Sequence, residues 1–356
     1  MSTTTDAVRH RRSRGPAVVL AVVATVLAGL LAGCAPAAEP GTTPSTGSSS
    51  SPSAAASFPF TQKNAWGTTE IPAQPTKIAV VSEGDRDIVY ALGLTPVIQP
   101  VYPGAFVSGY VADAEKALGV SNPVTYDATD STDFEAIAAA GPDVILGVNH
   151  YSMDDEYTQL AKIAPVVTTA TKDEIDTLTW DARVRRVAEA LGLKEKGEEV
   201  IAAARKAAAD AAAAHPELKG KSYTYVVVHP SQLTYSSNAD ADTGVFEDLG
   251  LVRAENSKKY NSNNDGVSLE NVDQFDADIL LIAYPFGDEG VISKSALETN
   301  KLWQAIPAVK DGRWGVVDAE NGLASNIAYP SVLAYPWVVE KIVPVLVAAA
   351  EGKGGA

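Results

Sequence analysis

The sequence of 356 residues contains a single cysteine, Cys34, so the chain cannot form an internal disulfide. A disulfide framework, on which many small exported domains rely, is therefore excluded. The lone thiol lies at the end of an apolar stretch that follows a basic run from Arg9 to Arg14. This order of a basic and an apolar segment is typical of a secretory signal peptide. The position of Cys34 thus indicates a role in export rather than in the fold.

Histidine is also scarce, with four residues: His10, His150, His215 and His229. The sequence has no Gly-x-Ser-x-Gly elbow, no His-Glu-x-x-His pair and no phosphate-binding glycine-rich loop after an expected strand. These absences argue against hydrolases, zinc proteases and nucleotide-dependent enzymes. A dedicated zinc or manganese site would also need more histidine and carboxylate ligands. We therefore expect neither catalysis nor a cofactor of the chain's own.

Positively charged residues are in the minority, with 28 Lys and Arg against 44 Asp and Glu and a formal net charge of −16. Cleavage of residues 1–33 would remove four arginines and one aspartate, a net +3, which leaves −19. A protein with this negative charge is poorly suited to bind nucleic acids or anionic lipid surfaces, and its field mildly favours cationic ligands. About 300 residues follow the N-terminal region, a length that suits two lobes rather than one core.

The N-terminal signal ends in Leu31-Ala32-Gly33-Cys34, which resembles the lipobox of bacterial lipoproteins. The resemblance implies a signal peptide over residues 1–33, diacylglycerol on the Cys34 sulfur and a lipid anchor in the membrane. A signal-anchor helix is an alternative, but the apolar run is short for a span of about 20 residues. Arg11-Arg12 also leaves twin-arginine export open, although the apolar residues that usually follow such a pair are missing.

Residues 34–58 consist mostly of Ala, Pro, Gly, Ser and Thr. Such a segment cannot bury enough apolar surface to offset the entropy of ordering, so we expect a disordered tether. The tether would let the folded part reach away from its anchor on the extracytoplasmic face of the cell membrane.

Expected strands and helices alternate from residue 75 onward. Short apolar runs rich in β-branched residues predict buried strands. Their alternation with helices indicates parallel sheets flanked by helices, and hence an α/β fold. The expected strands are 77–82, 142–148, 165–167, 222–228, 278–283 and 314–318, and the expected helices are 85–92, 134–140, 157–163, 245–249 and 329–350.

The two halves of this region echo each other. Glu135 lies eight residues before Asp143, where one expected strand begins, and Glu270 lies eight residues before Asp278, where another begins. A helix, a tight turn and a buried strand thus recur at matching places. We therefore predict two Rossmann-like lobes of similar topology.

A helical tract joins the two halves over residues 178–215, where Trp180 and Val184 begin an apolar pattern of helical spacing. As one continuous helix it would span on the order of 50 Å at 1.5 Å per residue, and Gly192 is the point at which it could be interrupted. The predicted parts are an N-terminal lobe over 59–177, this inter-lobe helix, a C-terminal lobe over 216–328 and a helix over 329–356 that packs back on the lobes.

Six stretches support a family resemblance because they follow one another in the same order. They are Ile71–Ile78, Asp133–Leu146, Leu160–Val167, Val187–Gly192, Val267–Glu270 and Ile306–Trp314. The sequence resembles the iron-siderophore-binding proteins of ABC transporters, in the class that includes the cobalamin-binding and ferric hydroxamate-binding proteins. The resemblance implies two α/β lobes joined by one long helix, with the ligand in the cleft between them. It also implies a permease and its ATPase as partners, on which Glu135 and Glu270 would dock.

The loops that follow the expected strands are the candidate binding site, because ligands of α/β sheets bind beyond the carboxyl ends of the strands. Aromatic rings offer flat contact with a polar tip, and a guanidinium donates to chelating oxygens. Arg86 could instead pair with Glu83 or Asp85 at the surface. Trp180 and Trp303 are expected in the core. The candidate ligand-binding residues are Arg86, Tyr102, His150, Tyr151, Tyr235, Tyr284 and Phe286.

These loops carry only one arginine, whereas a strongly anionic ferric chelate would need more cations. A neutral or cationic hydroxamate siderophore therefore fits better as the ligand. Haem or cobalamin is the alternative on the same fold, with His150 or Tyr151 as an axial ligand to haem iron. A surface lipoprotein that reuses the fold without transport is a further alternative.

Overall fold

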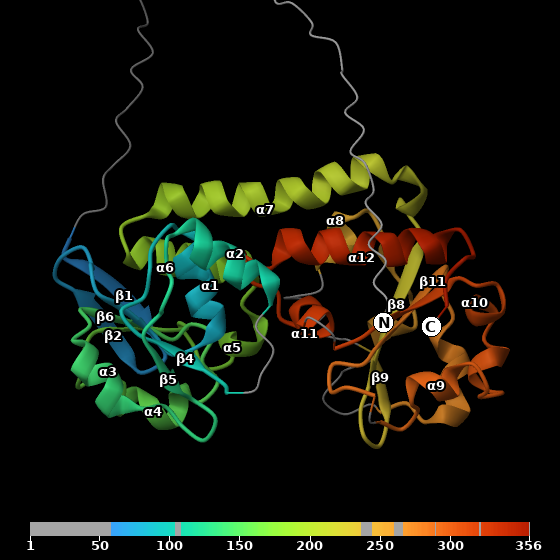
Figure 1. The fold of residues 1–356 in the computed structure, drawn as a ribbon, viewed down its shortest axis with the longest axis horizontal. Coiled ribbons are helices and arrows are strands. Elements are labelled where there is room, and N and C mark those ends of the chain that lie inside the picture. The colour runs from blue at the N-terminus through green and yellow to red at the C-terminus, as the bar shows by residue number, and fades with distance from the viewer. Residues whose placement is uncertain are drawn as a thin grey trace, which may run out of the picture. The chain divides into compact units, whose positions relative to one another are not determined.

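The computed structural model describes residues 58–103, 108–235, 244–259, 266–288, 290–319 and 322–355. The predicted signal peptide, Cys34 and all but the last residue of the predicted tether lie outside these ranges. Two lobes, each with a parallel sheet and surrounding helices, form the described chain (Figure 1), which is the architecture predicted from the sequence. No helix within the described ranges is both long and apolar enough to cross a membrane.

Short parallel strands form the centre of the N-terminal lobe. Strand β3 (Ile78–Val80) pairs with β6 (Val144–Leu146), which pairs with β7 (Val166–Val167). A parallel bridge joins β3 to the adjoining pair β4 (Gln99–Val101) and β5 (Thr125–Asp127). An antiparallel hairpin, β1 (Phe60–Asn64) and β2 (Gly67–Ile71), precedes them and was not predicted. The helices are α1 (Glu83–Ala91), α2 (Gly109–Ala117), α3 (Phe134–Ala140), α4 (Met153–Leu160) and α5 (Glu174–Thr177).

The C-terminal lobe repeats this arrangement. Its sheet has the order β10 (Val252–Arg253), β8 (Ser222–Val228), β11 (Ile279–Ala283), β12 (Trp314–Val317), all parallel, and β9 (Leu233–Tyr235) runs antiparallel to β8. The helices are α8 (Gly244–Asp248), α9 (Lys294–Leu297), α10 (Pro307–Lys310) and α11 (Leu323–Ala328), with 3₁₀ turns η1 (Pro216–Leu218), η2 (Ser257–Lys259), η3 (Leu269–Phe275) and η4 (Trp303–Ala305).

The sequence echo between the halves corresponds to one local structure used twice. The Asp143 carboxylate, at the start of β6, accepts hydrogen bonds from the backbone N–H groups of Thr76 and Lys77, both at 2.9 Å. Asp278, at the start of β11, accepts from the backbone N–H and hydroxyl of Ser222, both at 2.8 Å. In each lobe the aspartate ties the chain that enters the adjacent strand. Asp143 and Asp278 therefore make the same strand-entry contact, one in each lobe.

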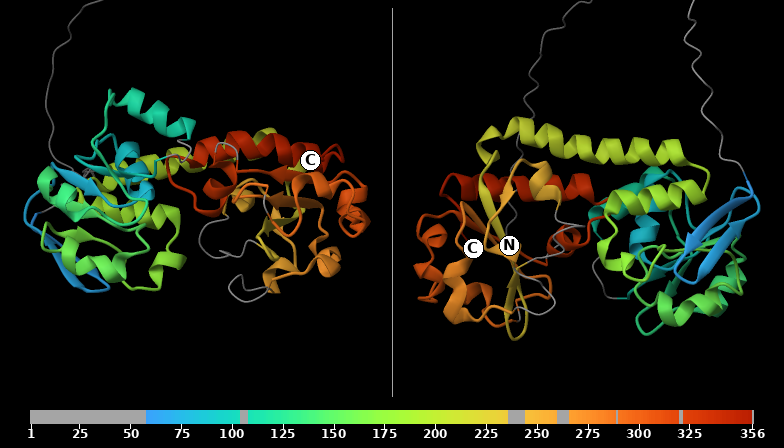
Figure 2. Two further views of the ribbon diagram at one scale, coloured as in Figure 1. Left: turned by 60° about the horizontal axis from the view of Figure 1, so that its bottom comes forward. Right: turned by 180° about the vertical axis from the view of Figure 1, so that it is seen from behind.

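The helix predicted over 178–215 is interrupted. It divides into α6 (Trp180–Ala190) and α7 (Lys194–Ala214) because Gly192 adopts a left-handed φ of 73°, a conformation that glycine adopts readily. Of these two helices, α7 passes from one lobe to the other and packs beside α12 (Tyr335–Ala350), as Figures 1 and 2 show. Its 21 residues span about 30 Å rather than 50 Å.

The helix predicted over 329–350 also starts later than expected. Helix α11 ends at Ala328, Tyr329 takes an extended φ of −133°, and α12 begins at Tyr335. Pro330 explains the break, because proline pushes the preceding residue out of the helical region. The helix predicted over 157–163 is shifted in turn, and runs as α4 from Met153 to Leu160. The break at Tyr329 leaves its side chain in the loop between the two helices.

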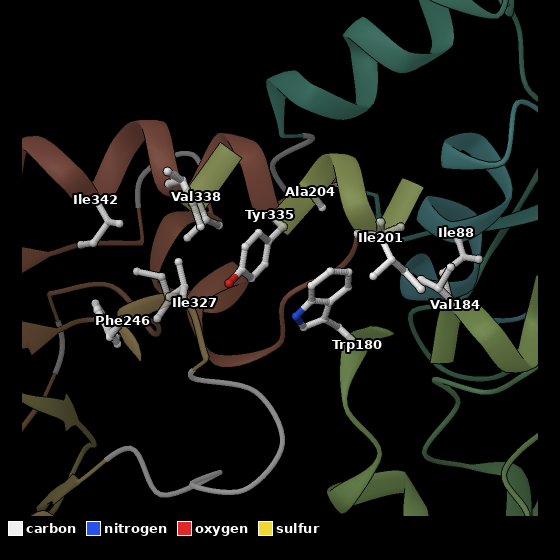
Figure 3. Packing of buried hydrophobic residues seen from close by; sticks show 14 of the residues in the cluster. Ile88, Trp180, Val184, Ile201, Ala204, Phe246, Ile327, Tyr335, Val338 and Ile342 are labelled. Atoms are coloured by element: carbon white, nitrogen blue, oxygen red, sulfur yellow. The ribbon is translucent and has the colours of Figure 1, made fainter. Parts of the chain in front are cut away.

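One apolar core runs through both lobes along α6, α7 and α12. Figure 3 shows Val184 and Ile201 on the side of the N-terminal lobe, and Val338 and Ile342 on the side of the C-terminal lobe. Trp180 packs on Tyr335 between them, with ring centroids 4.9 Å apart. A continuous core across the junction resists large hinge motion, since opening it would expose apolar surface to water.

Candidate functional site

A cavity of about 610 Å³ lies between the two lobes. The N-terminal lobe contributes the loops that follow β3, β4 and β6 together with part of α2, and the C-terminal lobe contributes the loop after β11 and the region of α11. Volumes of this order are typical of small-molecule sites. Residues from both sides of the junction therefore surround one space, as a ligand held between lobes requires.

Arg86 is buried at the wall of this cavity. Ser82 caps the start of α1 just after β3, and its Oγ accepts from the Asp85 N–H at 3.1 Å. Because α1 begins there, Arg86 lies in the first turns of the helix, at the cavity wall. The Arg86 guanidinium donates from Nε (3.1 Å) and Nη2 (2.9 Å) to Oδ1 of Asp87, and from Nη1 to Glu83 at 3.2 Å. The pairing with Glu83 predicted as an alternative is thus present, but Arg86 also lines the cavity.

The acid–base balance around Arg86 keeps it charged. Burial acts to lower the pKa of Arg86, but the carboxylates of Asp87 and Glu83 outweigh that effect and hold the pKa above its ordinary value. Burial raises the pKa of Asp87, and the positive charge of Arg86 opposes that rise. The Arg86 guanidinium, which keeps its proton in proteins, forms a buried salt bridge with Asp87, with 2.9 Å between Nη2 and Oδ1.

A second polar network holds the loop after β6 against α1. The buried Asp85 carboxylate accepts from the backbone N–H groups of Val148 and Asn149, both at 3.2 Å, and from Ser82 Oγ at 2.6 Å. Burial raises the pKa of Asp85. Asn149 Oδ1 accepts from Arg183 Nη1 at 2.8 Å, which fixes this second guanidinium at the cavity wall. The polar wall is therefore held in place by groups of the protein itself.

Tyrosines dominate the apolar part of the cavity. Tyr102, Tyr151 and Tyr329 line it and keep 40%, 58% and 58% of their surface exposed. Tyr151 of one lobe meets Tyr329 of the other edge to face, with ring centroids 6.5 Å apart. Burial raises the pKa of Tyr102 and of Tyr110, so both are neutral phenols at neutral pH. Such rings offer flat contact together with a hydroxyl that can hydrogen-bond.

The predicted site residues divide into two groups. Arg86, Tyr102 and Tyr151 line the cavity. His150 does not, and its Nε2 lies 2.7 Å from the Glu156 carboxylate. Phe286 is 61% exposed and packs on His229 rather than lining the cavity.

Tyr235 and Tyr284 were predicted in the site, but the structure places them in the core of the C-terminal lobe, with exposures of 2% and 0%. Tyr235 lies on β9, and its hydroxyl donates to the backbone carbonyl of Gln274 at 2.9 Å. Tyr284 directly follows β11, and its ring continues the inward-facing side of that strand. A position at the end of a strand is therefore not sufficient to bring a side chain to the cavity.

Sequence reasoning missed several residues that line the cavity, among them Tyr110, Arg183 and Tyr329. Tyr110 lies on α2 and Arg183 inside α6, so neither follows a strand. Tyr329 is the first residue of the helix expected over 329–350. The proline after Tyr329 was the available signal, since an X-Pro pair disfavours helix at X and favours an exposed loop.

Charges in the cavity wall balance. The charged lining residues are Glu83, Arg86, Asp87 and Arg183, two acids and two bases, so their formal charges cancel. Serine, asparagine and tyrosine side chains provide the other polar groups. Within the described ranges, no three His, Cys, Asp or Glu side chains gather in a group that could hold a metal ion.

Comparison with known proteins gives consistent matches along the chain. A family model described as "Periplasmic binding protein" matches residues 78–320. The Fe(3+)-citrate-binding protein YfmC of Bacillus subtilis strain 168 is 28% identical over 258 residues, which cover 72% of this chain and 76% of that protein. The probable siderophore-binding lipoprotein YfiY of the same organism is 30% identical over 272 residues, covering 72% and 80%.

Solved structures with the same fold include binding proteins captured with their ligands. Streptococcus pneumoniae TIGR4 PiaA in complex with ferrichrome matches with a TM-score of 0.69 at 26% identity, covering 82% of this chain and 99% of that chain. Staphylococcus aureus FhuD2 with bound ferrioxamine B matches with a TM-score of 0.59, covering 78% and 100%. At 18% identity the second likeness concerns the fold alone.

Proposed function

This chain belongs to the periplasmic binding protein family, and we propose that it is the extracytoplasmic binding component of an ABC importer for a ferric siderophore of hydroxamate type. Membership of a family of binding proteins confirms the resemblance seen in the sequence and the expectation that the chain is not an enzyme. The iron complex is cargo in this proposal, and the chain needs no cofactor of its own.

The main support for a hydroxamate siderophore as the ligand is the balance of charges in the cavity wall. A ferric ion bound by three hydroxamates is neutral, and such a complex presents oxygen-rich edges on an apolar body. The donors of Arg86 and the phenol of Tyr102 match the oxygens, and the exposed faces of Tyr151 and Tyr329 match the apolar body. The ferrichrome complex of a relative at 26% identity supports this choice.

Fluorescence titration of residues 58–356 with a panel of ferric complexes tests the proposal. We expect saturable binding of ferrichrome or ferrioxamine B that is tighter than binding of ferric citrate, haemin or cobalamin. The name of the relative YfmC makes ferric citrate the competitor that matters most. Tighter binding of ferric citrate than of either hydroxamate complex would refute the hydroxamate assignment.

Haem and cobalamin are the alternative ligands on this fold. His150 is bonded to Glu156 and does not line the cavity, so it is poorly placed as an axial ligand. Tyr151 does line the cavity and stays the candidate axial ligand. A Soret shift of haemin on binding that is lost in Tyr151→Phe would favour haem over a siderophore.

Arg86→Ala is expected to weaken hydroxamate-siderophore binding by about 1–3 kcal/mol, roughly 5- to 150-fold in Kd, because a charged donor to the chelating oxygens is lost. Isothermal titration of the folded variant measures the effect. Arg185→Ala is the matched control, since Arg185 pairs with Asp181 and Glu198 and does not line the cavity. Wild-type affinity in Arg86→Ala would place the ligand elsewhere.

The membrane anchor is proposed from Cys34, which lies outside the described residues. Cys34→Ser should abolish incorporation of a labelled fatty acid while the thermal midpoint of the folded part stays unchanged, because the core described above is built from residues that follow position 57 in the sequence. Metabolic labelling followed by immunoprecipitation measures this directly. Label retained by the serine variant would contradict lipidation at Cys34. The lipoprotein name of the relative YfiY supports the anchor.

The proposed partners are an ABC permease and its ATPase, contacted through one acidic residue of each lobe. Glu135 is the second residue of α3 and Glu270 the second residue of η3, and both are exposed. Two similar lobes that meet a pseudo-symmetric membrane partner can use one charged contact each, which fixes orientation as well as affinity. A surface lipoprotein without a transport role would have no use for this matched pair.

A further inference from the structure

We propose that Asp87 is a specificity-determining residue, whose buried carboxylate cancels the charge of Arg86 and so directs the cavity toward neutral and cationic chelates and away from anionic ones. The inference rests on the proposed function, because it concerns which ferric chelate the same cavity prefers.

Asp87 is the effective counter-charge of Arg86. It is 3% exposed, and its Oδ1 accepts from both Nε and Nη2 of Arg86. The other carboxylate on this guanidinium, Glu83, has a side chain that is 55% exposed. Water and salt screen an exposed charge far more than a buried one, so Glu83 contributes less to the field in the cavity. Asp87 therefore sets the positive electrostatic potential that Arg86 presents to a ligand.

The protein holds this carboxylate in position from the opposite lobe. Asp87 Oδ2 accepts from Ser331 Oγ, in the loop between α11 and α12, at 2.6 Å. The hydroxyl of Tyr110, on α2 of the same lobe as Asp87, lies 3.4 Å from this oxygen and donates to Asn326 Oδ1 at 2.9 Å. Ser331 Oγ in turn accepts from the Ala334 N–H at 3.0 Å. With both oxygens occupied, the carboxylate cannot turn away when a ligand enters. An anionic chelate that approaches Arg86 meets a fixed negative charge beside it.

Asparagine separates the charge of Asp87 from its shape. In Asp87→Asn the amide oxygen still accepts from Arg86 and the amide nitrogen can donate to Ser331 Oγ, so the contacts persist while the negative charge is lost. The formal charge of the cavity wall then rises from zero to +1. The affinity for an anionic ligand should therefore rise, and the affinity for a cationic ligand should fall.

The test measures a ratio of dissociation constants, that for anionic ferric citrate over that for cationic ferrioxamine B, by titration at fixed ionic strength. We expect Asp87→Asn to lower this ratio at least tenfold. Asp181→Asn is the matched control, because Asp181 is also buried and bonded to arginines, Arg185 and Arg205, yet does not line the cavity. It should leave the ratio unchanged.

Two more variants separate charge from structure. Ser331→Ala removes the contact between the lobes without changing any charge. It should weaken the binding of both ferric complexes by the same factor. Arg86→Gln removes the positive charge and should raise the ratio of dissociation constants. If Asp87→Asn fails to fold, Arg86→Gln serves as the test in its place. An unchanged ratio in Asp87→Asn, or an equal shift in Ser331→Ala, overturns the inference while the proposed function stands. A wild-type protein that binds neither ferric complex overturns both.

Discussion

Reversing both charges in Glu135→Lys with Glu270→Lys is expected to abolish uptake of the ferric siderophore by cells, while ligand affinity and thermal stability of the isolated protein stay nearly unchanged. Both residues are exposed, and neither lines the cavity. Each lies in the first turn of a helical segment, where a carboxylate adds only about 0.3–1 kcal/mol through the helix dipole. The fold therefore has little to lose from the change, whereas a docking contact inverted in sign becomes repulsive.

Uptake of ⁵⁵Fe-siderophore in a strain that depends on this protein measures the effect. The matched control is Glu70→Lys with Glu298→Lys, which changes the net charge equally and takes one exposed glutamate from each lobe. Normal uptake by the Glu135 and Glu270 double variant would end the docking hypothesis. Loss of ligand binding in that variant would show that the pair serves the cavity or the fold instead.

Tyr284→Ala is expected to destabilise the protein by about 3–5 kcal/mol, because it leaves a cavity in the core of the C-terminal lobe. The side chain is fully buried in the apolar cluster that contains Phe275 and Trp303. Burial raises the pKa of Tyr284, whose hydroxyl has no hydrogen-bond partner within the described residues. Tyr284→Phe should therefore be neutral or stabilising, since it removes a desolvated polar group without changing the packing.

Urea denaturation followed by circular dichroism gives the free energies of unfolding. Tyr235 provides the contrast, because its hydroxyl donates to Gln274 O and its phenylalanine variant should lose about 1 kcal/mol. Ligand affinity of folded Tyr284→Phe should equal that of the wild type. A clear loss of affinity with no loss of stability would return Tyr284 to the binding site predicted from the sequence.

Local sequence was enough for elements whose ends carry their own signals. The expected strand 222–228 coincides with β8, a run rich in β-branched and aromatic residues buried between its neighbours. The expected helix 134–140 coincides with α3, since Asp133 caps its start by accepting from the Ala136 N–H at 2.9 Å and Gly141 ends it at φ 60°. The hairpin of β1 and β2 was missed, because its polar, half-exposed strands lack a continuous apolar run.

The sequence by itself determined the α/β class, the two similar lobes and several of the loops that border the cavity between them, because strand patterns and the matched Asp143 and Asp278 are local features. Only the tertiary structure decided which side chains face that cavity. Arg86 and Tyr284 both follow buried strands, yet one lines the cavity and the other fills the core. The direction of a side chain at a strand end depends on the phase of the pleat and on what packs above it. Tyr329 reaches the cavity from 178 residues beyond Tyr151, a pairing that only the packing of the lobes creates.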